Sequence, residues 1–386
     1  MHQRKPVNSL IYAKKVIFPT PMANALQSLN MVYSFAAQGV ETYFSPGNRT
    51  GQKNLQAELE KKYGLFPEKN LHFHFLSGRH KGLYGLRFRL NLAYRWLSAS
   101  EGTVFFARDI KEWLTILRLK KRINRPFFME MHEVLADEHA REGTGKADDY
   151  RRLEQQIINI SDGIIATTKP LARRVNELFN PKVPVLVAPN GYNEDIFRPQ
   201  PAVDLSGKIS LLYFGSFHPG KGVHALLEAM SFLPEKFTLT LLGGSPIERV
   251  SRLKDQYEHE QGRVEFVGAV SPSNIGKYLE KSQMIVIPQS SDEFFSPIKL
   301  SEAMGAGLPT VVTPLFPLTS RVTHGKEVYV AEGKGAEEIA KAILRVADNV
   351  DLAHSLQAGM QLKSQGQTWK DRAAACVEFI NDNMSS

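Results

Sequence analysis

The feature that most constrains the fold is an alternation of short apolar runs with helical patterns, which occurs twice along the chain. In the first half, runs typical of buried strands occupy 13–19, 41–46, 102–109, 125–133, 162–168 and 182–191, and a helical pattern spans 23–39. In the second half, strand-like runs at 209–216, 237–244, 264–268, 283–289 and 309–314 alternate with helical patterns at 222–233, 272–282 and 296–307. Such alternation predicts an α/β chain of parallel, doubly wound sheets.

The chain length predicts more than one domain, because 386 residues exceed one ordinary hydrophobic core. A proline-containing stretch at 193–208 separates the two alternating halves. We therefore expect an N-terminal domain at 1–195, a C-terminal domain at 196–365, and a terminal helix within 366–386 that packs back toward the N-terminal domain. Two doubly wound domains would face a central cleft and bind ligand at the carboxyl ends of their strands.

Composition favours a soluble globular enzyme, with 42% hydrophobic and 23% charged residues. No apolar run approaches the roughly 18–20 residues that span a bilayer, and the basic N-terminus lacks the apolar core of a signal peptide. One cysteine, Cys376, cannot form an internal disulfide, and no Cys/His cluster suggests zinc, so a reducing cytoplasm is expected. The net charge of +8 favours acidic partners, or reflects only a soluble basic surface.

The stretch "SPIKLSEAMGAGLP" combines the signals of a helix with those of an anion site. Ser296 is a plausible N-cap, Pro297 suits the first helical position, and Gly305 or Gly307 would end the helix. A helix N-terminus that follows a buried strand is suited to a diphosphate. Lys299 and Glu302 lie three residues apart and could hold a phosphate and a sugar hydroxyl; the alternative is an ordinary surface ion pair.

A second strand-to-helix corner has the same design in "YFGSFHPGKGVHALLEAM". Its glycines allow close approach of a ligand to the backbone, and Lys221 supplies a charge for phosphate. It is not a Walker motif, because the final Ser/Thr is missing. Two such corners in one domain strengthen the hypothesis of a phosphate site.

The N-terminal half offers weaker signals. His132 and Glu133 end an apolar strand, where they could act at the cleft or hold structure. Asn24 follows a proline-rich turn and either caps the next helix or faces the cleft. The stretch 78–96 interleaves basic residues with leucines and aromatic residues. This pattern is typical of a surface on anionic lipid, or of an amphipathic helix with a solvated basic face.

Four stretches of the second half, in order, give the chain a resemblance to a known family: "APNGYNEDIFRP", "YFGSFHPGKGVHALLEAM", "VEFVGAVSPSNIGKYLEKSQMIVIP" and "SPIKLSEAMGAGLPTVV". The chain resembles the family 4 retaining glycosyltransferases, whose GT-B fold pairs two Rossmann-like domains. The variant "SPxKLxE" resembles that of one branch of the family. The first half is similar to the family's acceptor domain through "PMANALQSLNMVYSFAAQGVETYF" and "MEMHE".

The resemblance assigns roles to individual residues. Glu302 matches the second glutamate of the family's E-x7-E motif, which holds the nucleotide ribose, whereas the first glutamate falls on Phe294, next to Glu293. Lys221 matches the diphosphate lysine, but the usual arginine five residues earlier is Ser216, a loss that Lys299 could compensate. The implied catalytic set is His132, Glu302 and Lys299, the donor-binding set is Gly215, Ser216, Lys221, Val270, Phe295, Ser296, Pro297, Ile298 and Leu300, and the acceptor-side set is Asn24, Arg108 and Glu133.

The implied reaction transfers a glycosyl group from a nucleotide-diphosphate sugar to a glycan or lipid-linked acceptor, with retention of configuration, in envelope polysaccharide or glycoconjugate synthesis. No D-x-D triplet occurs in the chain, so we expect no metal and no cofactor. The expected place is the cytoplasm, including the inner face of the membrane through 78–96. A 2-epimerase of the same fold and a non-catalytic binding protein stay open; the absence of any recognised nucleic-acid motif argues against nucleic acid as a partner.

Overall fold

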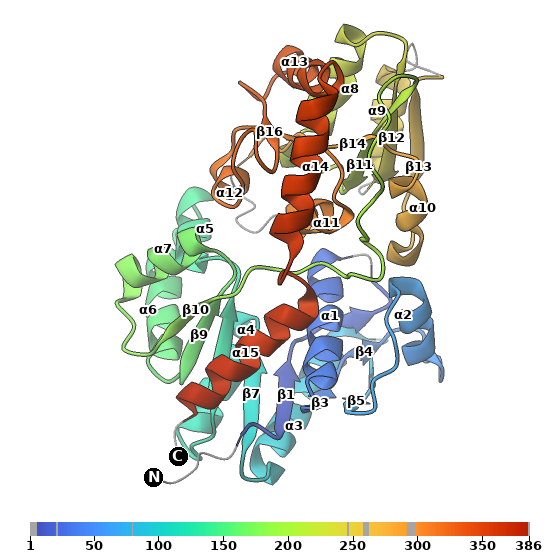
Figure 1. Ribbon diagram of the computed structural model, residues 1–386. Coiled ribbons are helices and arrows are strands. Elements are labelled where there is room, and N and C mark those ends of the chain that lie inside the picture. The colour runs from blue at the N-terminus through green and yellow to red at the C-terminus, as the bar shows by residue number, and fades with distance from the viewer. Residues whose placement is uncertain are drawn as a thin grey trace. The chain divides into compact units, whose positions relative to one another are not determined.

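The computed structural model describes residues 6–20, 22–78, 80–244, 247–257, 262–291 and 298–384. The chain forms two compact units, one of Met1–Asn190 with Trp369–Ser386 and one of Gly191–Thr368. Each unit is built on its own parallel sheet (Figure 1). The predicted α/β class with parallel sheets is confirmed.

The N-terminal unit contains a seven-stranded parallel sheet in the order β10-β9-β8-β7-β1-β3-β5. A smaller sheet has the order β2-β4-β6. The strands are β1 (Ser9–Ala13), β2 (Ile17–Phe18), β3 (Glu41–Phe44), β4 (Gly47–Asn48), β5 (Leu71–Phe73), β6 (Leu76–Ser77), β7 (Thr103–Ala107), β8 (Phe127–Met131), β9 (Gly163–Ala166) and β10 (Val185–Val187). The strand order reverses between β1 and β7, the position at which sheets of this kind bind ligands.

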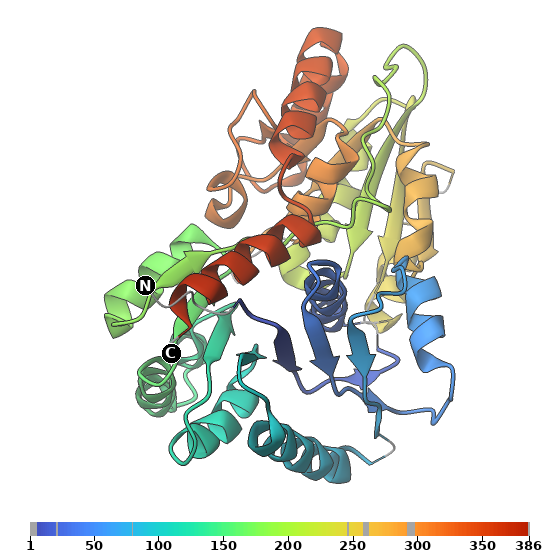
Figure 2. The same ribbon diagram turned by 60° about the horizontal axis from the view of Figure 1, so that its bottom comes forward.

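Helices cover both faces of the seven-stranded sheet (Figure 2). One core lies under α1 (Ala23–Ala37), α2 (Leu55–Tyr63) and α15 (Trp369–Asn383). The core on the other face lies under α3 (Lys81–Ser98), α4 (Ile110–Lys120), α5 (Leu135–Arg141), α6 (Ala147–Ile158) and α7 (Lys169–Phe179). The last helix of the chain, α15, lies within the range 366–386 and packs on α1 in the N-terminal unit.

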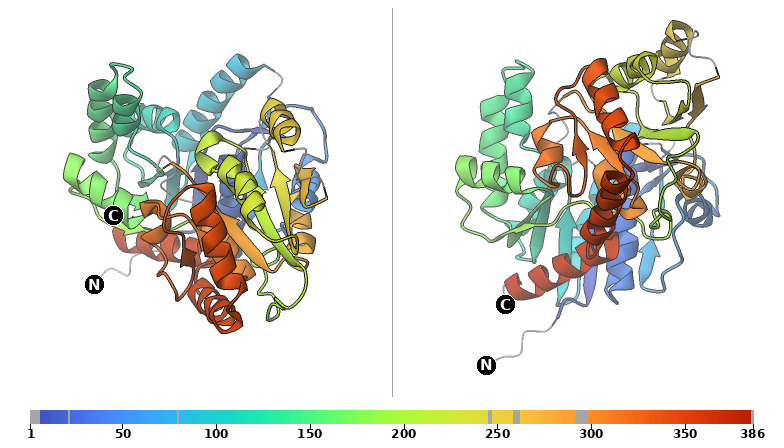
Figure 3. Two further views of the ribbon diagram at one scale, coloured as in Figure 1. Left: turned by 90° about the horizontal axis from the view of Figure 1, so that it is seen from above. Right: turned by 45° about the horizontal axis from the view of Figure 1, so that its top comes forward.

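The C-terminal unit contains a six-stranded parallel sheet in the order β13-β12-β11-β14-β15-β16. Its strands are β11 (Ile209–Gly215), β12 (Phe237–Gly243), β13 (Val264–Gly268), β14 (Met284–Ile287), β15 (Thr310–Val312) and β16 (Tyr329–Val330). Its α-helices are α8 (Val223–Ala229), α9 (Ile247–Gln256), α10 (Gly276–Leu279), α11 (Ile298–Ala306), α12 (Phe316–Thr319), α13 (Ala336–Ala347) and α14 (Val350–Ser364). Helix α8 packs on α13, and α11 packs on α14 (Figure 3).

Helix boundaries follow the glycines of the sequence. Gly39, with φ +82°, follows α1, and Gly307, with φ +59°, follows α11, so Gly307 rather than Gly305 ends that helix. Asn24 is the second residue of α1, and Met22 occupies the N-cap. The alternative in which Asn24 caps this helix is therefore wrong.

The predicted first strand is also wrong in its position. The buried central strand is Ser9–Ala13, whereas 13–19 contains a loop with Lys14 and Lys15 and only the short β2. The physical reason is that Leu10, Ile11 and Tyr12 form a continuous apolar run that is buried within the sheet. The two lysines end that run.

Candidate active site

Two turns of the C-terminal unit meet at the switch in strand order between β11 and β14. Ser290 N donates to Gly220 O at 3.0 Å, and Ser290 Oγ donates to Pro219 O at 3.1 Å. Gly222 has φ +70°, and a Cβ atom there would lie 1.7 Å from Pro288 O. The turn after β11 therefore packs directly on the backbone that follows β14. Lys221 lies within this turn, at the end of a short 3-10 helix, Pro219–Lys221.

Helix α11 places a charge pair at the end of β11. Lys299 Nζ donates to Glu302 Oε2 at 2.8 Å, and the two side chains are 33% and 8% exposed. Lys299 Nζ also lies 4.7 Å from the centre of the Phe214 ring. A Cβ atom on Gly215 would lie 3.4 Å from Lys299 Cε. The structure thus brings Gly215, Lys299 and Glu302 together.

The other donor-side candidates have different surroundings. Ser216 O accepts a hydrogen bond from the Tyr213 hydroxyl at 2.6 Å. Val270 is partly buried against the core, and Leu300 is fully buried in it. Ile298 is the first described residue of α11. Phe295, Ser296 and Pro297, like Glu293 and Phe294, lie outside the described residues.

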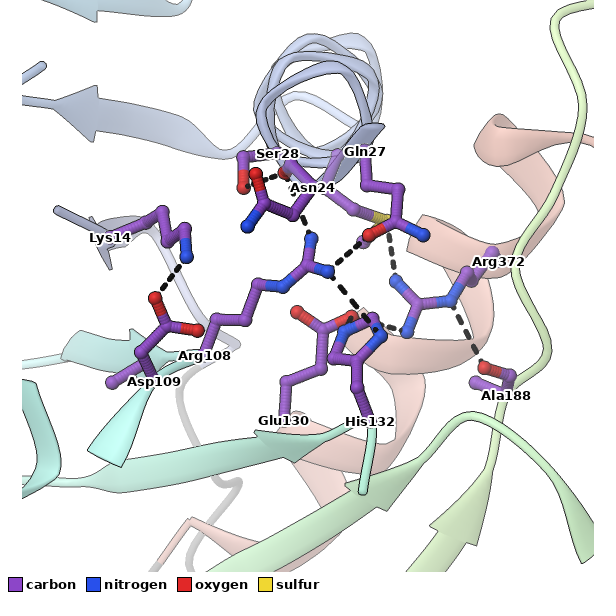
Figure 4. Close-up of polar contacts among 12 residues, drawn as sticks. Lys14, Asn24, Gln27, Ser28, Arg108, Asp109, Glu130, His132, Ala188 and Arg372 are labelled. Atoms are coloured by element: carbon purple, nitrogen blue, oxygen red, sulfur yellow. Dashed lines mark hydrogen bonds and ion pairs between the residues drawn. The ribbon is translucent and has the colours of Figure 1, made fainter. Parts of the chain in front are cut away.

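In the N-terminal unit, the catalytic candidate His132 and two acceptor-side candidates form one cluster (Figure 4). Arg108 is buried, and its Nη1 donates to Asn24 O at 3.1 Å. Its Nη2 donates to Gln27 Oε1 and lies 3.4 Å from His132 Nδ1. A guanidinium only donates, so Nδ1 of His132 accepts and the ring proton lies on Nε2. The third acceptor-side candidate, Glu133, is exposed.

Beneath His132 lies a buried ion pair that the sequence analysis missed. Arg372, from α15, donates from Nη2 to Glu130 Oε1 at 2.6 Å, and both side chains are almost fully buried. Glu130 Oε1 is 3.2 Å from His132 Nε2, and the Tyr12 hydroxyl donates to Glu130 Oε2 at 3.3 Å. The signal in the sequence was a single glutamate within the buried strand "FFMEM". Its partner, 242 residues away, had no such signal.

The electrostatics of this cluster follow from its burial. Burial, and after it the Arg108 cation, lower the pKa of His132 to about 4, although Glu130 opposes the shift. Burial alone would raise the pKa of Glu130, but Arg372 and His132 hold that pKa well below its usual range. At neutral pH the cluster therefore consists of a neutral imidazole, a carboxylate and two guanidinium groups.

A second buried carboxyl lies at the start of α4. Lys14, after β1, pairs with Asp109, and Glu112 is 2% exposed. Burial and the neighbouring Asp109 raise the pKa of Glu112 to about 8, although Lys14 opposes the shift. Glu112 Oε2 has no hydrogen-bond partner among the described residues. This carboxyl is therefore protonated at neutral pH.

The described part of the chain contains no group of three or more His, Cys, Asp or Glu side chains arranged to hold a metal ion. The expected metal independence stays a prediction. Within the same residues, no helix is both long enough and apolar enough to cross a membrane.

The second half of the chain matches a family of known enzymes. Residues 208–349 match the family model described as glycosyl transferases group 1. The chain carries a glycosyltransferase domain. With two Rossmann-like units, the enzyme has the predicted GT-B fold, which solved structures share.

Two curated relatives illustrate the similarity in sequence. The enzyme is 26% identical over 335 residues to a D-inositol 3-phosphate glycosyltransferase of Thermobispora bispora, across 80% of this chain and 74% of that protein. It is 23% identical over 269 residues to a GDP-mannose-dependent alpha-(1-6)-phosphatidylinositol monomannoside mannosyltransferase of Mycobacterium tuberculosis, across 64% of this chain and 69% of that protein. Both relatives carry names of sugar-transferring enzymes.

Two solved structures illustrate the similarity in fold. Anabaena Alr3699/HepE in complex with UDP-glucose has a TM-score of 0.73 and 15% identity, across 97% of this chain and 99% of that chain. Sucrose-phosphate synthase (tll1590) of Thermosynechococcus elongatus has a TM-score of 0.73 and 17% identity, across 97% of this chain and 98% of that chain.

Proposed function

We propose that this enzyme is a retaining glycosyltransferase, of the branch with the "SPxKLxE" variant, that uses a nucleotide-diphosphate sugar. The observation that carries the proposal is the Lys299–Glu302 pair beside Gly215, at the switch in strand order of the C-terminal sheet. This is the position at which doubly wound sheets bind nucleotides. The UDP-glucose complex of the similar HepE structure and the GDP-mannose in a relative's name support a donor of this class.

The pair has a chemical role in this proposal. Transfer from a nucleotide-diphosphate sugar passes through an oxocarbenium-like transition state, and the leaving diphosphate gains negative charge. Lys299 and Lys221 stabilise that charge, and the N-terminal end of α11 adds its dipole. Glu302 accepts hydrogen bonds from the nucleotide ribose. Lys299 lies beside Gly215, the residue before Ser216, so it supplies the cation that Ser216 lacks. We propose that no metal is required.

In the N-terminal unit, we assign His132 to the donor sugar and Asn24, Arg108 and Glu133 to the acceptor side. A neutral His132 suits this role, because an imidazolium would repel an oxocarbenium ion. Glu130 Oε1 lies 3.2 Å from Nε2 of the ring, and Arg372 pairs in turn with Glu130. The acceptor is a glycan or lipid-linked hydroxyl compound of the envelope, at the cytoplasmic face of a membrane. The phosphatidylinositol monomannoside in a relative's name supports a lipid-linked class.

The test is release of nucleotide diphosphate from a panel of UDP-, GDP-, ADP- and dTDP-sugars, in the presence of a chelator. Glu302→Gln and Lys299→Met should abolish release. A matched control exists in the same unit, because Lys341 and Glu337 form a 2.8 Å pair on α13 with side chains that are 65% and 61% exposed. Lys341→Met and Glu337→Gln should leave release unchanged.

Three outcomes would count against parts of the proposal. Release that survives both Glu302→Gln and Lys299→Met would contradict the assigned donor site. Release that needs a divalent cation would contradict metal independence. Conversion of the donor to an epimer, with no acceptor consumed, would favour the epimerase alternative. Retention is checked on the product by the one-bond coupling constant of the new anomeric carbon.

A further inference from the structure

Helix α3 carries two apolar faces instead of one. The side chains that pack into the N-terminal core are Tyr84, Phe88, Leu92 and Trp96. Five other large apolar side chains of the same helix are 48–69% exposed: Leu83, Leu86, Leu90, Tyr94 and Leu97. Their spacing of three and four residues places them in one stripe along the helix. A helix of a soluble protein normally carries polar residues on the face away from the core.

The charged side chains of α3 itself have one sign. Arg87 and Arg89 are exposed on α3 itself, and residues 69–100 contain no Asp or Glu. The Trp96 indole donates from Nε1 to Ile123 O at 3.2 Å, which brings the turn after α4 beside the end of α3. In that turn Ile123 is 37% exposed, and Lys121 and Arg122 are exposed. We call the stripe, Arg87, Arg89 and the turn 121–123 the α3 face.

We propose that the α3 face docks the enzyme on the surface of a bilayer that contains anionic phospholipid. The helix lies along the membrane over about 27 Å, given 1.5 Å per residue and the 18 residues of α3. The leucines enter the boundary of the acyl chains, and the arginine and lysine side chains meet the lipid phosphates. A second copy of this chain fits less well, because a symmetric contact through α3 would bring Arg87 and Arg89 against like charges.

The exposed residues differ from those that the sequence pattern emphasised. Among the aromatic residues of 78–96, Tyr84, Phe88 and Trp96 are buried and belong to the core. Arg95 is half-buried, with its guanidinium 5.0 Å from the centre of the Tyr43 ring. The residues left for lipid are four leucines, Tyr94 and the exposed cations.

The docking proposal uses no residue of the proposed donor site. Its test is therefore independent of the test of that site.

The experiment is co-sedimentation of the full chain with large vesicles, without any nucleotide sugar. Vesicles of phosphatidylcholine alone are compared with vesicles that also contain phosphatidylglycerol. We expect binding to the anionic vesicles, weaker binding to the neutral ones, and release as salt is raised. Leu86→Gln with Leu90→Gln, and separately Arg87→Gln with Arg89→Gln, should each weaken binding about tenfold or more.

Matched controls separate this surface from general effects of composition. Leu362, on α14 of the other unit, is 65% exposed, and the Arg152 side chain, on α6, is 72% exposed. Leu362→Gln and Arg152→Gln should leave vesicle binding unchanged. Far-ultraviolet circular dichroism checks that every variant is folded. Donor turnover with a water-soluble acceptor should be unchanged in the α3 variants, so loss of binding is distinguishable from loss of the donor site.

Three results would overturn the proposal. The first is absence of binding to anionic vesicles by the folded chain. The second is binding that the α3 variants leave intact. The third is a dimer, seen by light scattering without lipid, that the Leu86→Gln and Leu90→Gln changes dissolve, because it would make a second copy the occupant of the α3 face.

Discussion

At the scale of single residues, the buried ionisable groups of the N-terminal unit give the most specific predictions. Glu130 and Arg372 are almost fully buried, and each neutralises the other. A buried pair of this kind contributes little compared with an apolar pair, but breaking it leaves an uncompensated charge. Glu112 carries no such uncompensated charge at neutral pH, because burial raises its pKa to about 8 and the carboxyl keeps its proton.

Replacing Arg372 by Met should destabilise the N-terminal unit by about 3–5 kcal/mol, because Glu130 is left buried without its cation. All three tryptophans, Trp96, Trp113 and Trp369, belong to this unit, so urea unfolding followed by tryptophan fluorescence reports on it alone. Adding Glu130→Gln should recover part of the loss. As a control, Arg152→Met breaks an exposed pair with Asp149 and should cost less than about 1 kcal/mol. Equal costs for both arginines would contradict this account.

Glu112→Gln should stabilise the protein at neutral and alkaline pH but not at pH 4. The unfolded carboxyl ionises near 4.5, whereas the folded one keeps its proton up to about 8. The native residue therefore contributes stability below pH 4.5 that is lost as pH rises through the window to 8. The stability difference between variant and native protein should grow across this window and then level off. A difference that is independent of pH would show that Glu112 is ionised in the folded protein.

At the scale of helices and strands, the sequence predicted elements best where local pattern and burial agree. The run 264–268 is β13, and the helical pattern at 23–39 contains α1. The first strand was misplaced because apolar residues flank Lys14 and Lys15 on both sides. Which of the two apolar runs becomes the buried strand depends on strand pairing in the folded sheet, which the local pattern does not contain. Spacing within one helix predicted the contact of Lys299 with Glu302. No local pattern could pair Glu130 with Arg372, which depends on where α15 packs.

Gly222→Ala should disrupt the turn between β11 and α8 more than backbone strain alone explains. Gly222 and Gly325 have φ values of +70° and +74°, but only the first would place a Cβ atom against another backbone, at 1.7 Å from Pro288 O. Gly325→Ala should therefore cost only about 1–2 kcal/mol. Gly222→Ala should lower the melting temperature further and weaken nucleotide binding. Calorimetry of both variants gives the comparison, and equal melting temperatures would contradict the close approach.

At the scale of the whole molecule, the chain enters the C-terminal unit at Gly191 and leaves it at Thr368. The segment that returns to the N-terminal unit supplies Trp369, Ala373, Cys376 and Ile380 to its core, and Arg372 to Glu130. The sequence predicted a terminal helix that packs back, but not the buried pair that it completes. The contribution of α15 to the stability of the N-terminal unit follows from its core residues and from that pair, and neither could be predicted from the sequence.

Truncation after Thr368 should unfold the N-terminal unit and leave the C-terminal unit folded. The deletion exposes the apolar surface of α1 and leaves Glu130 without a cation, whereas no residue of the C-terminal unit is removed. Hydrogen exchange should show lost protection in β1, β7 and β8 and retained protection in β11, β12 and β14. Retained protection in both units would mean that α15 contributes little.

The same return segment sets an order on biosynthesis. Because the chain is synthesised from its N-terminus, all of Gly191–Thr368 leaves the ribosome before α15, which is the last helix of the N-terminal unit. The C-terminal sheet can therefore close while the earlier half still lacks part of its core. During that interval the incomplete half presents apolar surface on α1, and a chaperone that recognises such surface would encounter this half of the nascent chain for longer.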